Sequence, residues 1–270
     1  MSASPPHHKN RPEKTGNNAV GRKDVDRKER LFAALDLGTN NCRLLIAQPE
    51  GCGFRVIDGF SRVVRLGEGV GEAGTLSEAA IERTIDALKI CANKISRRRV
   101  SNGRYVATQA ARSARNSDYF IRRVKDETGI EMEIISSREE AELTLTGCFS
   151  LLEPSYEYVL MFDVGGGSAE FVWARILKMG GAQILGWTSL PCGVVTLTET
   201  HGSKEFAPLE YKSLVSSVVE IVRPFDLEFG ISDNIARGRV QMVGTAGTVT
   251  TVAGLDMCLA RYDRSRVDGS

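Results

Sequence analysis

Apolar and polar positions in the first half of the chain predict strands followed by helices. Residues 31–47, LFAALDLGTNNCRLLIA, form two apolar runs around a polar centre, which indicates strand, turn and strand. Between Leu76 and Arg97 apolar residues recur every three or four positions, as on one face of an amphipathic helix, and Ser77 is a natural start signal. The pattern further predicts strands at 53–60, 105–108 and 131–135, a helix at 117–128 ended by Gly129, and a helix at 138–152.

The second half of the chain repeats this order of elements. Residues 159–190 have the pattern of a strand, a glycine turn and two further strands. After them the sequence predicts a helix at 209–223, a strand at 240–243 and a Gly-Thr-Ala-Gly-Thr turn into a helix that runs through Leu259. Because both halves open with hairpin strands and continue as alternating strands and helices, the sequence indicates an α/β fold.

The two opening hairpins also resemble each other. Aligning Asp36 with Asp163 gives an offset of 127 residues, which pairs Gly38 with Gly165 and Asn40 with Gly167. The match fits two related lobes, each of which presents a turn to a shared cleft. The match is short, and coincidence between two unrelated hairpins explains it about equally well.

Composition sets the first thirty residues apart from the rest of the chain. Residues 1–30 hold eight Lys/Arg and four Asp/Glu with almost no apolar residues, so we expect a disordered basic tail. The net charge of the whole chain is +1, so the remaining residues are slightly acidic. They lack the broad basic field of a protein that binds duplex nucleic acid. Any affinity for polyanions must therefore come from a local site.

The sequence also argues against a membrane protein and a zinc protein. No stretch approaches the roughly 18 uninterrupted apolar residues of a membrane span, and the tail lacks the apolar or amphipathic segment of a targeting peptide. Six cysteines are scattered without paired spacing, as expected of reduced thiols, and two of the three histidines lie in the tail. We therefore expect a cytoplasmic protein.

A glycine turn interrupts the apolar run MFDVGGGSAEFVWA. The consecutive residues Gly165, Gly166, Gly167 and Ser168 offer unhindered backbone N–H groups, the arrangement that surrounds a phosphate oxygen. Asp163 before the turn and Glu170 after it could supply the carboxylates that Mg²⁺ prefers beside substrate phosphates. The alternative is a plain flexible turn, with Glu170 pointing to solvent, which explains most such stretches.

Two further turns are candidates for binding phosphate. Thr39 and Asn40 in the first hairpin offer hydroxyl and amide donors, although Asn40 could simply take a left-handed turn conformation. Gly244 and Gly247 lie between a strand and a helix, where the helix N-terminus would favour an anion. Ordinary capping of that helix by Thr248 is the simpler explanation of this turn.

Glu140 and Arg112 have both structural and functional interpretations. Ser137-Arg138-Glu139-Glu140 has the spacing of a capping box, in which Glu140 bonds back to the Ser137 backbone. The spacing alone favours this interpretation, and nothing local distinguishes Glu140 from Glu139 as a catalyst. Arg112 follows a strand at a place where a guanidinium could clamp phosphate, although most arginines are surface residues.

Taken together, five segments resemble the exopolyphosphatase and guanosine-pentaphosphate phosphohydrolase (Ppx/GppA) family. They are LDLGTNNCRLLIA, ATQAARSARNSDYF, IEMEIISSREEAEL, FDVGGGSAEFVWA and VGTAGTVTTVAGL, and they are ordered and spaced as in that family over residues 31 to about 265. The resemblance implies an α/β fold with two ribonuclease-H-like lobes of the actin-like ATPase superfamily and a cleft between them. We expect the first lobe at 31–153 and the second at 154–270.

The resemblance also implies a role for each candidate residue. Glu140, the second glutamate of SREEA, matches the family's catalytic base, which orients and deprotonates the attacking water. Asp163 and Glu170 match its magnesium-associated carboxylates. The positions that match phosphate-binding residues are Thr39, Asn40, Arg112 and Gly165–Ser168. The resemblance thus implies removal of the terminal phosphate of polyphosphate or of the 5′ terminal phosphate of guanosine pentaphosphate, with Mg²⁺ as cofactor.

The sequence departs from the family pattern at three places. Ser136-Ser137 stands where the family usually has Ser-Gly, and Ala141-Glu142 stands where it usually has Ala-Arg. Members generally continue beyond the point where this chain stops, so we expect either a fragment or a short variant with an incomplete second lobe. Two alternative functions stay open, a kinase or ATPase of the same superfamily and a non-catalytic polyphosphate or alarmone sensor. Dimerisation is common in such families, so a homodimer is possible, but nothing in these residues establishes it.

Overall fold

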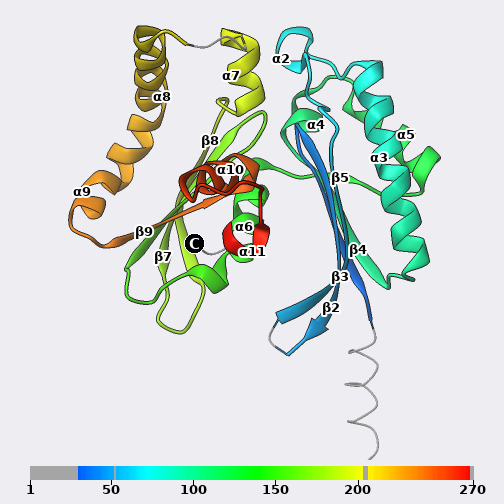
Figure 1. Cartoon of the computed structure of the whole chain (residues 1–270), viewed down its shortest axis with the longest axis horizontal. Coiled ribbons are helices and arrows are strands. Elements are labelled where there is room, and N and C mark those ends of the chain that lie inside the picture. Colours follow the sequence, from blue (N-terminus) through cyan, green and yellow to red (C-terminus); the bar gives the residue numbers. More distant parts are fainter. Residues whose placement is uncertain (1–29, 52, 203–205, 268–270) are drawn as a thin grey trace, which may run out of the picture.

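The computed structural model describes residues 30–51, 53–202 and 206–267, so the predicted tail at 1–30 lies almost wholly outside the described residues. Two separate β-sheets organise this part of the chain, one of five strands and one of four (Figure 1). Both are mixed sheets, and each opens with an antiparallel hairpin followed by a parallel neighbour. The predicted α/β architecture with two lobes is confirmed.

The first sheet has the strand order β3-β2-β1-β4-β5. Its strands are β1 (Phe32–Leu37), β2 (Asn41–Glu50), β3 (Gly53–Val63), β4 (Asn102–Ala107) and β5 (Glu133–Ile134). In β1 the residues Ala33, Leu35 and Leu37 are buried and their neighbours are exposed, as the period-two pattern of a strand requires. The antiparallel pairing of β1 with β2 places Asp36 opposite Arg43 at the end next to the turn.

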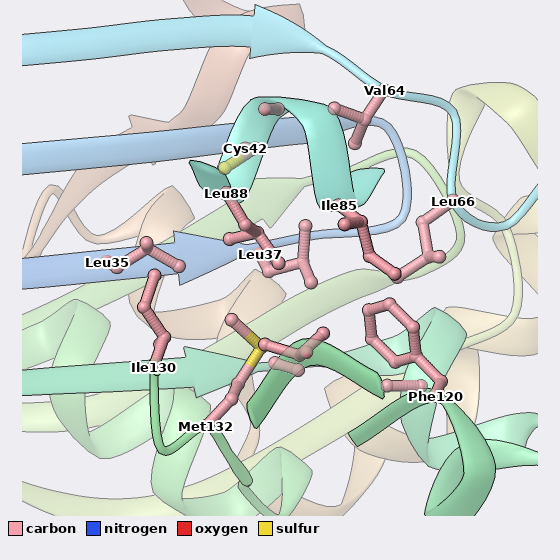
Figure 2. Close-up of a cluster of buried hydrophobic side chains, with 14 of the residues drawn as sticks. Leu35, Leu37, Cys42, Val64, Leu66, Ile85, Leu88, Phe120, Ile130 and Met132 are labelled. Atoms are coloured by element: carbon pink, nitrogen blue, oxygen red, sulfur yellow. The ribbon is translucent and has the colours of Figure 1, made fainter. Parts of the chain in front are cut away.

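In the described part of the chain four helices accompany this sheet, and the two longer ones run along one of its faces (Figure 1). They are α2 (Val70–Ala73), α3 (Glu78–Arg97), α4 (Gln109–Ser113) and α5 (Ser117–Thr128). Helix α3 starts as predicted, because the Ser77 hydroxyl accepts a hydrogen bond from the Ala80 N–H, and α5 ends at Gly129 in a left-handed conformation. Figure 2 shows the buried core between helices and sheet, to which Leu35 and Leu37 of the sheet and Leu88 and Phe120 of the helices belong.

The second sheet has the strand order β8-β7-β6-β9. Its strands are β6 (Tyr158–Val164), β7 (Ala169–Ile176), β8 (Ala182–Leu190) and β9 (Val240–Thr245). The hairpin of β6 and β7 closes through the glycine turn, and its register places Asp163 directly opposite Glu170. Strand β9 runs parallel to β6 and ends beside Asp163, since Thr245 is its register partner.

The remaining helices belong to the second sheet or extend from it. They are α6 (Ser137–Gly147), the short 3₁₀ helix η1 (Phe149–Leu151), α7 (Val194–His201), α8 (Pro208–Phe229), α9 (Ile231–Ala236), α10 (Ala246–Asp256) and α11 (Arg264–Val267). Helix α6 packs on β7 and β8, and its Ala141 and Leu145 join the core of that sheet. We call the first sheet with α2–α5 the first lobe, and the second sheet with α6–α11 the second lobe.

Several predicted elements differ from the observed ones. The helix expected at 138–152 ends at Gly147, and η1 follows it. Helix α8 continues six residues beyond the predicted end and contains Pro224. Helix α7 was not predicted, because Val194-Val195-Thr196-Leu197-Thr198 is rich in β-branched residues, which have low helix propensity. The expected lobe boundary between 153 and 154 stays a prediction, although α6 packs on the second sheet.

The structure bears on two further expectations, which concern membrane spans and the state of the cysteines. Among the helices of the described residues, none combines the length and the apolar character that crossing a membrane requires. The five cysteines within the described ranges are free thiols, and four of them are buried. These thiols agree with the prediction that the cysteines are reduced.

Candidate active site

A cavity of about 660 Å³ lies where the loops of the two lobes converge. The turn Gly38–Asn41 of the first lobe and the turn Gly165–Ser168 of the second lobe both line it. The beginning of α10 and the start of α6, through Glu140, also contribute to its wall. The predicted cleft is therefore built from the turns that the hairpin alignment had paired.

The two turns approach each other closely across this cavity. A Cβ atom built on Gly166 would lie 3.0 Å from the Asn40 Cβ, and one built on Gly167 would lie 2.7 Å from the Thr39 Oγ1. Both positions thus exclude a side chain unless the opposite turn moves. The glycines of this turn are needed for close approach between the lobes, in addition to any contact with a ligand.

Two carboxylates flank the glycine turn on neighbouring strands. Asp163 accepts a hydrogen bond from the Thr245 hydroxyl at 2.9 Å. Glu170 is buried and accepts hydrogen bonds from the hydroxyls of Ser168 and Ser189 on its Oε1. Burial raises the pKa of both carboxyl groups above their ordinary values, and the charge of Asp163 adds to the effect on Glu170.

This arrangement fits a magnesium ion that takes only part of its ligands from the protein. Within the described residues, no group of three or more His, Cys, Asp or Glu is arranged to hold a metal by itself. Asp163 and Glu170 nevertheless line the same cavity, and one oxygen of each makes no hydrogen bond to the described residues. Mg²⁺ typically binds one or two carboxylates and completes its shell with water and phosphate oxygens.

The start of α6 determines that Glu140 reaches the cavity. The helix begins at Ser137, one residue earlier than predicted. The cap is Ser136, whose hydroxyl accepts from the Glu139 N–H, so Ser137 is already the first residue of α6. The predicted capping box with Ser137 as cap and Glu140 as its partner is therefore wrong. Glu139 occupies the N3 position and pairs with Arg104, which leaves the Glu140 side chain to line the cavity.

Arg112 contacts Glu140 from the first lobe. Both terminal nitrogens of its guanidinium lie 3.2 Å from the Glu140 Oε2, and the same group donates to the Ile135 carbonyl and to Gln109. Burial, helped by the charge of Glu170, raises the pKa of Glu140 to about 7, while Arg112 opposes this shift. The carboxylate is thus held in place with a pKa near neutral, as a general base requires.

The other predicted site residues divide into two groups. Thr39, Asn40, Gly165, Gly166, Gly167, Ser168 and Gly247 all line the cavity, together with Glu140, Asp163 and Glu170. Arg112 and Gly244 are not part of the lining. Arg112 is occupied with Glu140 and its neighbours, and Gly244 lies within β9, where a Cβ would meet the side chains of Phe162 and Val249. Their predicted role in phosphate binding remains a prediction.

Sequence reasoning did not select Asp36 and Arg43, which line the same cavity. They are register partners on β1 and β2. The Asp36 side chain is open to the cavity, but the protein around it desolvates the carboxylate and raises its pKa, while the Arg43 charge opposes the shift. The offset of 127 residues that pairs Asp36 with Asp163 was the available signal for the aspartate. Nothing in the local sequence distinguishes Arg43 from other arginines.

Comparison with known proteins agrees with this geometry. Residues 45–267 match the model of the Ppx/GppA phosphatase family. The chain is 32% identical over 250 residues to Exopolyphosphatase 2 of Mycobacterium tuberculosis strain H37Rv, covering 87% of this chain and 73% of that protein. It is also 32% identical over 254 residues to the bifunctional 3-dehydroquinate synthase/phosphatase of Fusobacterium nucleatum, covering 88% of this chain but only 36% of that longer protein.

Solved structures of proteins with similar sequences share the fold of this chain. A Ppx/GppA protein of Aquifex aeolicus superposes with a TM-score of 0.69 at 30% identity, covering 88% of this chain and 72% of that chain. An exopolyphosphatase-like protein superposes with a TM-score of 0.74 at 29% identity, covering 85% and 70%. The two-lobed fold, the cavity between the turns and these similarities lead to one conclusion. The chain belongs to the Ppx/GppA phosphatase family and is a hydrolase of that family.

Proposed function

We propose that the chain removes the terminal phosphate of inorganic polyphosphate, or the 5′ terminal phosphate of guanosine pentaphosphate, by attack of water at that phosphorus. The observation that carries the proposal is the position of Glu140. Its carboxylate lines the same cavity as the Gly165–Ser168 turn and has a pKa of about 7. A base of this pKa beside a cradle of backbone N–H groups suits hydrolysis of a phosphoanhydride.

Each part of the site has a distinct task in this proposal. Glu140 takes the proton of the attacking water, and Arg112 fixes the orientation of the carboxylate through Oε2. The N–H groups of the glycine turn and the Thr39 hydroxyl bind oxygens of the phosphate. Asp163 and Glu170 hold Mg²⁺, which when bound neutralises the negative charge of the phosphate oxygens. Arg43 adds a positive charge to the same wall.

The pH dependence of the reaction is expected to report Glu140. A base must be ionised, so kcat/KM should fall by about tenfold per pH unit on the acidic side of its pKa. The rate should begin to fall below the pKa of Glu140, which is about 7. Burial and the negative charges of Glu170 and Asp36 raise this pKa, and Arg112 lowers it. Phosphate release measured from about pH 5 to pH 9 should therefore rise and then level off near neutral pH. A flat profile would contradict the assignment.

The activity itself is tested by phosphate release from long-chain polyphosphate and, separately, from guanosine pentaphosphate. We expect release with Mg²⁺ and loss of at least about 100-fold after chelation, because the two carboxylates and the phosphate then repel one another. Adding Mg²⁺ back should restore the rate, which controls for unfolding during chelation. Release that is unaffected by chelation would exclude the proposed role of the metal, and transfer of phosphate to an acceptor other than water would favour a kinase.

A further inference from the structure

Helix α7 contacts the glycine turn through the backbone carbonyl groups of the turn. The N–H of Val194 donates to the Gly165 carbonyl at 3.0 Å, and the N–H of Val195 donates to the Gly166 carbonyl at 2.7 Å. The Thr196 hydroxyl donates to the Gly167 carbonyl at 2.9 Å. Three consecutive carbonyls of the turn are therefore held by the first three residues of α7.

The direction of the N–H groups of the glycine turn follows from these contacts and from the geometry of the peptide bond. In a trans peptide the carbonyl of one residue and the N–H of the next point in opposite directions. No peptide bond of the described residues is cis. Carbonyls that point toward α7 therefore leave the N–H groups of Gly166, Gly167 and Ser168 pointing away from it. None of these three N–H groups donates to an acceptor within the described residues, so they are available to a ligand in the cavity that the turn lines.

Gly193, the cap of α7, explains how the helix comes so close to the turn. A Cβ on this buried residue would lie 2.4 Å from the carbonyl carbon and oxygen of Gly166 and 2.5 Å from the Ser168 nitrogen. Its φ of −71° suits any residue, so the need for glycine arises from the contact alone. Nearer its C-terminal end α7 contacts the first lobe, where Glu199 accepts a hydrogen bond from the Gly69 N–H at 3.0 Å. Figure 1 shows α7 beside α2 at one end of the two lobes.

We propose that α7 positions the phosphate loop, with Gly193 and Thr196 as positioning residues that hold the carbonyls of Gly165–Gly167 so that the following N–H groups bind a phosphate in the cavity. The proposal rests on the proposed function, because it takes this turn as the site of phosphate binding. Neither residue touches the substrate. Their effect passes through the orientation of three peptide groups.

The test compares two threonines of the same helix. Thr196→Val removes the hydroxyl bonded to the Gly167 carbonyl, whereas Thr200→Val removes one bonded only to the Thr196 carbonyl within α7. Inorganic tripolyphosphate with Mg²⁺ serves as probe in calorimetric binding and in phosphate release. Loss of the one hydrogen bond should raise Kd and KM by about three- to tenfold in Thr196→Val. Thr200→Val and Thr196→Ser, which retains the hydroxyl, should resemble the wild type, and all three should melt at similar temperatures.

The outcomes separate this proposal from the proposed function. If wild type binds tripolyphosphate but releases no phosphate from it, from long-chain polyphosphate or from guanosine pentaphosphate, and Thr196→Val alone weakens binding, the proposed function fails and the role of α7 stands. If release is normal but the two valine variants have equal Kd and KM, the role of α7 is overturned and the hydrolase stands. If the wild type binds neither tripolyphosphate, nor long-chain polyphosphate, nor guanosine pentaphosphate, both are overturned.

Discussion

Glu140→Gln is expected to lower the rate of phosphate release by about 10²–10⁴-fold, the usual contribution of a general base. The amide keeps the shape of the side chain and can still accept a hydrogen bond from Arg112, so the loss should fall on kcat. Substrate binding should change little, because the phosphate contacts of the glycine turn and of Thr39 remain. Steady-state phosphate release with Mg²⁺ and calorimetric binding of tripolyphosphate measure the two effects.

Glu139→Gln provides the matched control for this variant. Glu139 lies on the same turn of α6 and pairs with Arg104 on the surface, outside the cavity lining. An exposed ion pair of this kind contributes only about 0–1 kcal/mol to stability, so the variant should fold and retain wild-type activity. Equal losses in the two variants would show that the effect arises from the helix start and not from a base at position 140.

Asp163→Asn is expected to lower Mg²⁺-dependent phosphate release by about 100-fold or more, since even outer partners of a metal ligand contribute 10–100-fold. The asparagine side chain can still accept the hydrogen bond of Thr245 but loses the negative charge that attracts the ion. The magnesium concentration that gives half-maximal activity should rise as well. A titration with Mg²⁺ measures both quantities, and Asp233→Asn, an exposed position on α9 outside the cavity lining, serves as control.

The same variant should behave in the opposite way in a stability measurement without metal. Burial raises the pKa of Asp163, so its ionised form is less favourable in the folded than in the unfolded chain, and stability falls as pH rises above the ordinary aspartate value. Asparagine removes this cost, so the metal-free variant should melt no lower than wild type at neutral pH. Mg²⁺ should raise the melting temperature of wild type more than that of the variant. An equal rise in both would remove Asp163 from the metal site.

Much of the fold could be predicted from local signals. Helix α3 and helix α5 carry both an apolar stripe and clear end signals, Ser77 and Gly129, and both were found with nearly correct bounds. Helix α7 was missed because its β-branched residues disfavour a helix when considered alone. Its contacts with the glycine turn come from tertiary packing, which a propensity does not contain.

The residues of the site that are neighbours in the sequence could be predicted. Those that come together only through the fold could not. The glycine turn and its flanking carboxylates stand together in the sequence, and the structure places all of them at one cavity. Glu140 could not be distinguished from Glu139 by spacing, because the choice between Ser136 and Ser137 as cap decides which glutamate faces the cavity. Likewise, Arg112 reaches Glu140 only because the two lobes meet there.

The most direct measurement follows the oxygen of water into the product. Wild type and Glu140→Gln are incubated with long-chain polyphosphate and Mg²⁺ in water enriched in ¹⁸O, and the released orthophosphate is analysed for the label. The proposed mechanism predicts one ¹⁸O atom in each orthophosphate released by wild type and almost no labelled product from Glu140→Gln over the same time. Labelled orthophosphate released by Glu140→Gln at the wild-type rate would contradict the role of Glu140 as the base that activates water.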